Sequence, residues 1–397
     1  DIEVPLGPVL ARMEVQGITV SAPVLAELNE RLGGQVADIA TRAYAEIGRE
    51  VNLGSPKQLQ EVLFDQLGMP KTRSNKTGFS TDAQSLQDLQ DLHPHPFLEL
   101  LLQHRDATKI RQIVETLQKG LGPDGRVHTN YEQTGSATGR LASNDPNLQN
   151  IPIKTEVGRE VRAAFVPGEG FDTLLTADYS QIEMRIMAHL SEDAGLIEAF
   201  NSGEDLHRFV GARVFGVDPA DVTPTMRTKV KAMSYGLAYG LSPFGLSKQL
   251  RIDVSEAKEL IADYLARFGG VRDYLRGVVE QARIDGFTTT LFGRRRPFGD
   301  LTSTNRTLRE NAERQALNSP IQGSAADVIK IAMLGIDADI RERGLASRML
   351  LQVHDELVLE VVAAEVEEIT AIVTDRMGHA ADLSVPLDVQ VGSGPNW

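Results

Sequence analysis

The chain centres on residues 227 to 240, which read R-T-K-V-K-A-M-S-Y-G-L-A-Y-G. Every fourth residue here is a cation or an aromatic ring: Arg227, Lys231, Tyr235 and Tyr239. At 3.6 residues per turn, this spacing places the four side chains on one face of a helix. The opposite side is apolar, and Gly240 is expected to end the helix.

This face suits a nucleoside triphosphate. Two cations one turn apart, Arg227 and Lys231, neutralise adjacent phosphate groups. Two aromatic rings further along, Tyr235 and Tyr239, offer flat surfaces for a base or a sugar, and Gly236 leaves room beside them. Taken alone, the pattern fits equally well a surface helix with solvated cations and half-buried tyrosines.

Two further stretches place carboxylates at the ends of strands. T-L-L-T-A-D-Y, residues 173–179, predicts a short strand that ends near Asp178. M-L-L-Q-V-H-D-E-L-V-L-E-V-V, residues 349–362, predicts two apolar strands joined at His354, Asp355 and Glu356. A lone aspartate beside a turn is more often a cap or turn residue. Two in one sheet, with a backbone carbonyl, are hard oxygen ligands that suit Mg²⁺ and two-metal displacement chemistry.

The composition is that of a globular protein with two or three subdomains. The chain has 397 residues, of which 41% are hydrophobic and 24% charged. No apolar run reaches the roughly 18 residues of a membrane span, and the first residues do not form a secretory signal. Cysteine is absent, which excludes disulfides and thiolate metal sites and is compatible with the cytoplasm.

The net charge of −14 argues against a protein that coats nucleic acid. Positive charge nevertheless gathers locally and can hold a phosphate backbone. The local groups are Lys71, Arg73 and Lys76; Arg105, Lys109 and Arg111; and Arg294, Arg295 and Arg296.

Other stretches predict the remaining elements. Residues 1 to about 130 are expected to be mainly helical, including a helix that Ser55 caps and Gly68 closes. Residues 71–80 predict a basic flexible loop, and 125–167 a structured loop rich in Gly, Ser, Asn and Pro. Residues 322–340 predict a strongly apolar helix.

Several long motifs follow one another in a fixed order. They are T-G-R-L-A-S-N-D-P-N-L-Q-N-I-P (138–152), D-Y-S-Q-I-E-M-R-I-M-A-H-L-S (178–191), D-L-H-R (205–208), residues 227–240, R-Q-A-L-N-S-P-I-Q-G-S-A-A-D (314–327) and Q-V-H-D-E (352–356). Together they resemble the family A DNA polymerases of the bacterial DNA polymerase I type, over nearly the whole chain.

The resemblance implies an α+β fold of the right-hand type, with an antiparallel palm sheet and helical thumb and fingers. The thumb is expected at 1–128, with its first helix packing on the palm. The palm is expected at 129–190 and 321–397, and the fingers at 191–320. The expected protein is a monomeric, cytoplasmic and nucleoid-associated bacterial enzyme that acts in DNA replication and repair. It extends primer–template DNA with dNTPs and two Mg²⁺ ions, for which Mn²⁺ can substitute, and it does not bind a membrane.

The resemblance also implies a role for individual residues. The metal ligands are Asp178, Asp355 and the carbonyl of Tyr179. The triphosphate is held by Arg227 and by Lys231, which donates a proton to pyrophosphate. The remaining nucleotide contacts are His207, Gln181, Tyr235, Tyr239 and Glu183, which blocks the 2′ position of the sugar. Minor-groove contacts come from Arg140 and Gln322, each donating to acceptors that all correct base pairs share. Other contacts with DNA come from Arg314, Asn147, Gln149, Asn318, Lys76 and, at the primer end, His354 and the catalytic Glu356.

The sequence departs from the family pattern in a few places. Tyr235 stands where many bacterial relatives have phenylalanine, which predicts weak discrimination against dideoxynucleotides. Lys154 replaces a frequent arginine, so a forked phosphate contact is not expected there. The polymerase is expected to lack both nuclease domains of the family and to be a fragment of a longer protein, and its C-terminus stops a few residues short of the usual ending.

Two alternatives compete with a DNA polymerase. A single-subunit RNA polymerase shares the hand and the metal chemistry, but Glu183 argues against it because such enzymes keep a small residue there. A non-catalytic binding module would not need the paired carboxylates Asp178 and Asp355 or the cations Arg227 and Lys231. A side activity of reverse transcription stays open.

Overall fold

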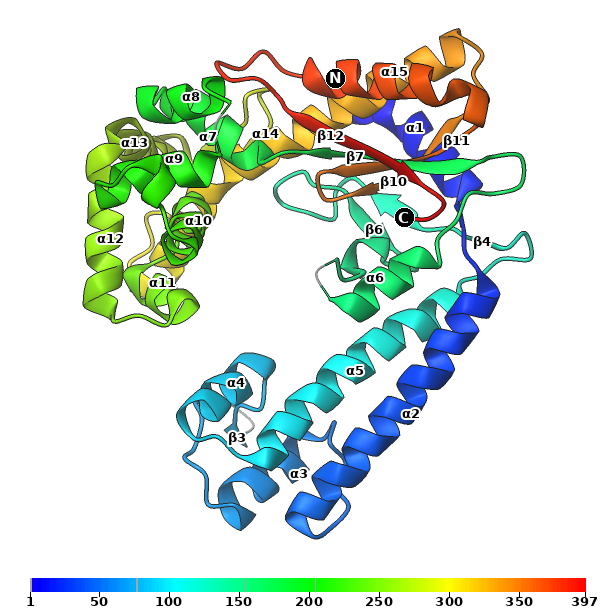
Figure 1. The fold of residues 1–397 in the computed structure, drawn as a ribbon. Coiled ribbons are helices and arrows are strands. Elements are labelled where there is room, and N and C mark those ends of the chain that lie inside the picture. Colours follow the sequence, from blue (N-terminus) through cyan, green and yellow to red (C-terminus); the bar gives the residue numbers. More distant parts are fainter. Residues whose placement is uncertain (1, 76–77, 154, 204) are drawn as a thin grey trace. The chain divides into compact units, whose positions relative to one another are not determined.

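The computed structural model describes residues 2–75, 78–153, 155–203 and 205–397 (Figure 1). Lys76 and Lys154 therefore lie outside the described residues. The chain forms two compact units. One comprises residues 1–17, 129–149 and 167–395, and the other residues 18–128, 150–166 and 396–397. Among the helices described, none combines the length and the apolar character needed to span a bilayer.

The larger unit is built on a four-stranded antiparallel sheet in the order β10-β11-β7-β12. Its strands are β7 (Thr173–Tyr179), β10 (Arg348–Val353), β11 (Glu356–Val361) and β12 (Val389–Gly394). Strand β7 is central because both β11 and β12 pair with it. The apolar runs in β7, β10 and β11 explain their burial, since strands covered by helices need few polar side chains.

Three helices pack against this sheet: α1 (Glu3–Gln16), α14 (Arg306–Glu342) and α15 (Val366–Gly378). Helix α1 contacts both α14 and β10, so the first residues belong to the same unit as the sheet. The apolar side of α14, including Val328, Met333 and Ile336, lies in the main hydrophobic core.

The helical part of the larger unit lies between β7 and α14 in sequence. Its elements are α7 (Ile182–Ser191), α8 (Ala194–Asn201), α9 (Leu206–Phe215), η3 (Pro219–Asp221), α10 (Pro224–Ala238), α11 (Pro243–Leu250), α12 (Val254–Arg267), α13 (Gly269–Asp285), β8 (Phe287–Thr289) and β9 (Arg295–Pro297). The larger unit also contains the antiparallel pair β5 (Asn130–Glu132) and β6 (Ala142–Asn144). A short 3-10 turn, η4 (Ala363–Glu365), precedes α15.

The smaller unit is dominated by two long helices that lie side by side, α2 (Ala22–Ile47) and α5 (Pro96–Lys119) (Figure 1). The shorter elements are β1 (Ile18–Thr19), α3 (Pro56–Gln60), η1 (Glu61–Gln66), β2 (Ser74–Asn75), β3 (Gly78–Phe79), α4 (Ala83–Leu92), β4 (Arg126–Val127) and α6 (Glu156–Ala163), with η2 (Leu148–Asn150) at the sequence boundary. A separate apolar cluster, which includes Leu59, Leu63 and Phe97, fills this unit.

Most elements lie where the sequence predicts them. The helix around residues 227–240, the strand at 173–179 and the hairpin at 349–362 are confirmed. Two expectations were incomplete. The 125–167 stretch contains the regular helix α6, and the 71–80 stretch contains the short paired strands β2 and β3. Helix α14 runs unbroken through Pro320 and across the position where the fingers were expected to end, so the four-part division of the hand stays a prediction.

Candidate active site

The two aspartates singled out in the sequence lie on neighbouring strands. Asp178 at the end of β7 pairs in register with Glu356, the first residue of β11. The amide of Tyr179 donates to the carbonyl of Asp355 at 3.2 Å, so the turn between β10 and β11 sits against the end of β7. Asp178 is exposed, whereas Asp355 is partly buried. Burial raises the pKa of Asp355, and the positive charges of Arg140 and His354 oppose the shift.

Glu183 in the first turn of α7 connects this edge of the sheet to two other predicted residues. Its carboxylate is 6% exposed and accepts a hydrogen bond from Arg140 Nη2 at 2.7 Å and another from the Tyr239 hydroxyl. Burial raises the pKa of Glu183, and the hydrogen bonds and charge from Tyr239 and Arg140 oppose that rise. Gln181 precedes the helix in a left-handed conformation, with φ of 57°, and its buried Oε1 has no hydrogen-bond partner within the described part of the chain.

Helix α10 presents the expected face. Thr223 caps its first turn by accepting from the Met226 amide at 3.2 Å, and Pro224 occupies the first helical position. Val230, Met233 and Leu237 lie in the core on the other side. The helix ends at Ala238, and Gly240 takes a left-handed φ of 66° close to Arg314 on α14.

Arg227 and Lys231, the two cations of this face, lie beside His207 of α9. His207 is 3% exposed, and its ring centroid is 6.0 Å from that of Tyr235. Burial and the charges of Arg227 and Lys231 together lower the pKa of His207 to about 4, against the opposing charge of Asp205. His207 is therefore neutral near pH 7, and its buried Nδ1 has no hydrogen-bond partner among the described residues.

Asp205 is a site residue that sequence reasoning passed over. Its carboxylate caps α9 by accepting from the Arg208 amide at 2.9 Å. It also accepts from Arg227 Nη2 at 2.7 Å and Nε at 3.3 Å. The hydrogen bond and charge of Arg227, with the Arg208 amide, lower the pKa of Asp205 to about 2, and burial opposes the shift. The signal available was an aspartate immediately before an amphipathic segment, which is the usual mark of a helix cap.

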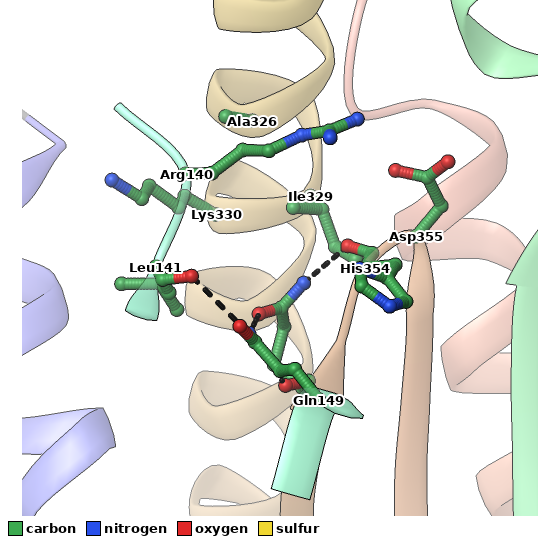
Figure 2. A pocket seen from close by; sticks show the side chains of 9 residues that line it. Arg140, Leu141, Gln149, Ala326, Ile329, Lys330, His354 and Asp355 are labelled. Atoms are coloured by element: carbon green, nitrogen blue, oxygen red, sulfur yellow. Dashed lines mark hydrogen bonds between the residues drawn. The ribbon is translucent and has the colours of Figure 1, made fainter. Parts of the chain in front are cut away.

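The predicted DNA contacts fall into two groups. Arg314, Asn318 and Gln322 lie one turn apart along α14, and Asn318 Nδ2 donates to Gln322 Oε1 at 3.4 Å. Gln149 lies near the carboxylates, where its amide donates to the carbonyls of Leu141 and Gln352 at 3.2 and 3.4 Å (Figure 2).

Arg140, Gln149, His354 and Asp355 line one pocket, together with Gln352 and Lys330, which the sequence did not single out (Figure 2). His354 is held in a left-handed conformation with φ of 57°, and Gln352 Nε2 donates to its carbonyl. Asn147 is exposed nearby in the chain and accepts from the amide of Gln149 at 2.9 Å.

Among the residues that the structure describes, no group of three or more His, Asp or Glu side chains is arranged to hold a metal ion. The oxygen donors at this edge are the carboxylates of Asp178 and Asp355 and the backbone of Tyr179. Such a donor set fits Mg²⁺, which commonly binds through one or two carboxylates and completes its shell with water and substrate phosphates.

The sequence profile of DNA polymerase family A matches residues 22–397. The chain belongs to DNA polymerase family A. It is 59% identical to DNA polymerase I of Mycobacterium tuberculosis strain H37Rv over 397 residues, and 44% identical to that of Geobacillus stearothermophilus over 399 residues. Each alignment covers all of this chain but only 44% and 45% of the relative.

A solved structure is also close to this family A chain. It is described as the POL domain of Pol1 from M. smegmatis in complex with DNA primer–template and dNTP. The TM-score is 0.96 at 58% sequence identity, and the match covers 100% of this chain and 70% of that one. The right-hand α+β fold expected from the motifs is confirmed.

Proposed function

We propose that the chain is a DNA-templated DNA polymerase that extends a primer 3′-OH with dNTPs and releases pyrophosphate. The observation that carries the proposal links α10 to the carboxylates. The Tyr239 hydroxyl, just after α10, donates to Glu183, which also accepts from Arg140, and Arg140 lines one pocket with Asp355. In agreement with this geometry, burial and the charges of Glu183, Asp355 and Asp178 raise the pKa of Tyr235. These observations support a single site in which the cationic and aromatic face of α10 holds a triphosphate beside metal-binding carboxylates.

Asp178, Asp355 and the Tyr179 carbonyl would hold two Mg²⁺ ions, or Mn²⁺ in their place. Metal bound there would lower the pKa of the primer hydroxyl and neutralise charge on the leaving group. Arg227 and Lys231 bind the triphosphate, and neutral His207 lies beside them as a further hydrogen-bonding group. The primer 3′-OH gives up its proton to water, its oxygen bonds to the α-phosphorus, and the bond from that phosphorus to the bridging oxygen breaks. Lys231 donates a proton to the departing pyrophosphate.

Glu183 would exclude the 2′-OH of a ribonucleotide. Its carboxylate is buried and already accepts from Arg140 and Tyr239, so an incoming hydroxyl meets a filled site. Arg140 and Gln322 would contact the minor groove of the new pair, and His354 and Glu356 the primer end. The close relatives named above are bacterial, and a cytoplasmic role in DNA replication and repair as a monomer is part of the proposal.

The test is extension of a primed template with Mg²⁺ and four dNTPs, run beside rNTPs. We expect extension with dNTPs only, and its loss in Asp355→Ala. Glu367→Ala removes an exposed carboxylate from α15 and serves as the matched control, with unchanged extension expected. Efficient use of rNTPs would favour the RNA polymerase alternative. Binding of primed DNA without any extension would favour a binding module.

A further inference from the structure

Four charged side chains form a cluster where α1, α14 and the β8–β9 hairpin meet. Arg294 Nε and Nη2 donate to Asp327 Oδ1 at 2.9 and 2.6 Å, and Nη2 also donates to Glu3. Lys330 Nζ donates to Glu3 Oε1 at 2.7 Å. The side chains of Asp327 and Lys330 are each 1% exposed. Two cations therefore balance two carboxylates, and of these four groups Asp327 and Lys330 are buried while Arg294 and Glu3 are 24% and 34% exposed.

The cluster fixes the direction of the Arg294 side chain. Thr290 Oγ1 accepts from the Arg294 amide at 3.1 Å and donates to Asp327 Oδ2 at 2.8 Å, so the backbone and the side chain of Arg294 are held by the same group. A buried ion pair resists disruption because removal of one partner leaves an uncompensated charge. Arg294 is thus held by these pairs and is partly buried, whereas the sequence suggested that residues 294–296 offer a basic group to a phosphate backbone.

The fixed guanidinium lies directly against the backbone that carries Arg140. Gly139 has φ of 84°, and a Cβ added there would come within 2.6 Å of Arg294 Nε and 2.8 Å of Arg294 Cζ. On the other side of the same turn, a Cβ at Gly323 of α14 would come within 2.6 Å of Thr290 Cγ2 and 3.1 Å of the Thr138 carbonyl. The turn before Arg140 therefore rests on the hairpin and on α14 with no space between them.

Arg140 leaves this turn toward the carboxylates. Its guanidinium donates to Glu183 at 2.7 Å and lines the pocket that contains Asp355, and Figure 2 shows the side chain extended across α14 in that direction. A small shift of the turn moves the guanidinium relative to both carboxylates, because the side chain projects from that backbone.

We propose that Arg294, held by Asp327 and Glu3, is a positioning residue for Arg140. Through Arg140 it sets the efficiency of insertion of the matched dNTP and the discrimination against a mismatched dNTP. The inference rests on the proposed function. In this role Arg294 acts through the Gly139 turn, against which its guanidinium lies, and not as a catalytic residue. Lysine at position 294 keeps the charge but lacks the fork that bridges both carboxylates and fills the space under Gly139.

The experiment is a double-mutant cycle on single-nucleotide insertion, with kcat and KM measured for a matched and a mismatched dNTP. Arg294→Lys is combined with Arg140→Ala. The matched control is Arg376→Lys. Arg376 also makes a bidentate contact with an aspartate of α14, because its Nε and Nη2 both donate to Asp339 at 2.7 Å. It also lies against a glycine of that helix, Gly335. Thermal unfolding of each variant is recorded in parallel.

We expect Arg294→Lys to lower kcat/KM for the matched dNTP on the order of tenfold. The ratio of kcat/KM for the matched dNTP to kcat/KM for the mismatched dNTP is expected to fall as well. In the Arg140→Ala background the same change is expected to have no further effect, and Arg376→Lys none in either background. Equal losses in both backgrounds, or a loss that merely follows the melting temperature, would overturn the proposal. Absence of extension by the unaltered chain would instead reject the proposed polymerase itself.

Discussion

Tyr235 lies half-buried on α10, within range of three carboxylates that, together with burial, raise the pKa of its hydroxyl. The hydroxyl therefore stays protonated and can replace the hydrogen bond that a dideoxynucleotide cannot make. We expect Tyr235→Phe to increase discrimination against dideoxynucleotides on the order of tenfold, the worth of one hydrogen bond near charge. Competition between ddNTP and dNTP in primer extension measures this discrimination. Tyr44→Phe in the smaller unit is the control. Equal terminator uptake by Tyr235→Phe would contradict the prediction.

His207 makes stability depend on pH. Its pKa is about 4 in the folded chain, below the ordinary value of 6.5, so the unfolded chain binds more protons between these values. The free energy of unfolding therefore falls as pH drops from 6.5 toward 4. We expect His207→Gln to remove on the order of 2 kcal/mol of that loss, a value reduced for solvent screening. Urea unfolding at pH 7 and pH 4.5 tests this, and an unchanged difference would count against it.

Asp205 has two separable tasks, capping α9 and pairing with Arg227. The ion pair is exposed, at 49% and 39% for the two side chains, so it contributes about 1 kcal/mol at most. We expect Asp205→Ala to cost roughly 1–2 kcal/mol of stability, mostly through the lost cap, whereas Asp205→Asn keeps the cap and costs less. Calorimetry on the two variants separates the tasks. Equal losses for both would mean that the charge, not the cap, dominates.

At the scale of elements, the end of α10 depends on Gly240. Its φ of 66° disfavours any other residue, and a Cβ would come within 3.2 Å of the Arg314 backbone. Gly286 has a similar φ of 75° but open space around it. Gly286→Ala therefore reports the conformational cost alone, about 1 kcal/mol. We expect Gly240→Ala to cost more in chemical unfolding and also to raise the KM for dNTP, because Tyr239 would shift. An equal loss of unfolding free energy in Gly240→Ala and Gly286→Ala would show that α14 moves aside without cost and would contradict the prediction.

Periodicity explains which elements could be predicted. The strand ending at Asp178, the hairpin at Asp355 and the cationic face of α10 follow from local spacing, and the structure has them. The first half of α14 was not foreseen as part of one helix, because Pro320 usually ends helices and only packing against the rest of the unit keeps it continuous. The cluster at Arg294 was also missed, since its partner Glu3 is far away in sequence and no local pattern encodes such a pair.

For the whole molecule, the net charge of −14 predicts that binding to DNA is modest and sensitive to salt. The logarithm of affinity should fall with the logarithm of salt concentration, by about 0.9 for each phosphate contact. Fluorescence anisotropy of a labelled primer–template between low and physiological salt measures the slope. A slope near zero would contradict binding through local basic groups such as Lys71 and Arg73.

The order of strands in the palm sheet also affects synthesis of the protein. Strand β7, which carries Asp178, pairs on one side with β11 and on the other with β12, and both neighbours come much later in sequence. During translation, residues 173–179 emerge from the ribosome long before residues 356–361 and 389–394 exist. The nascent chain must keep this apolar strand unpaired, or shielded by a chaperone, until residues 356–361 and 389–394 have been made. The two aspartates can meet only once β11 has left the exit tunnel, so the proposed metal site forms long after the strand that carries Asp178 has been made.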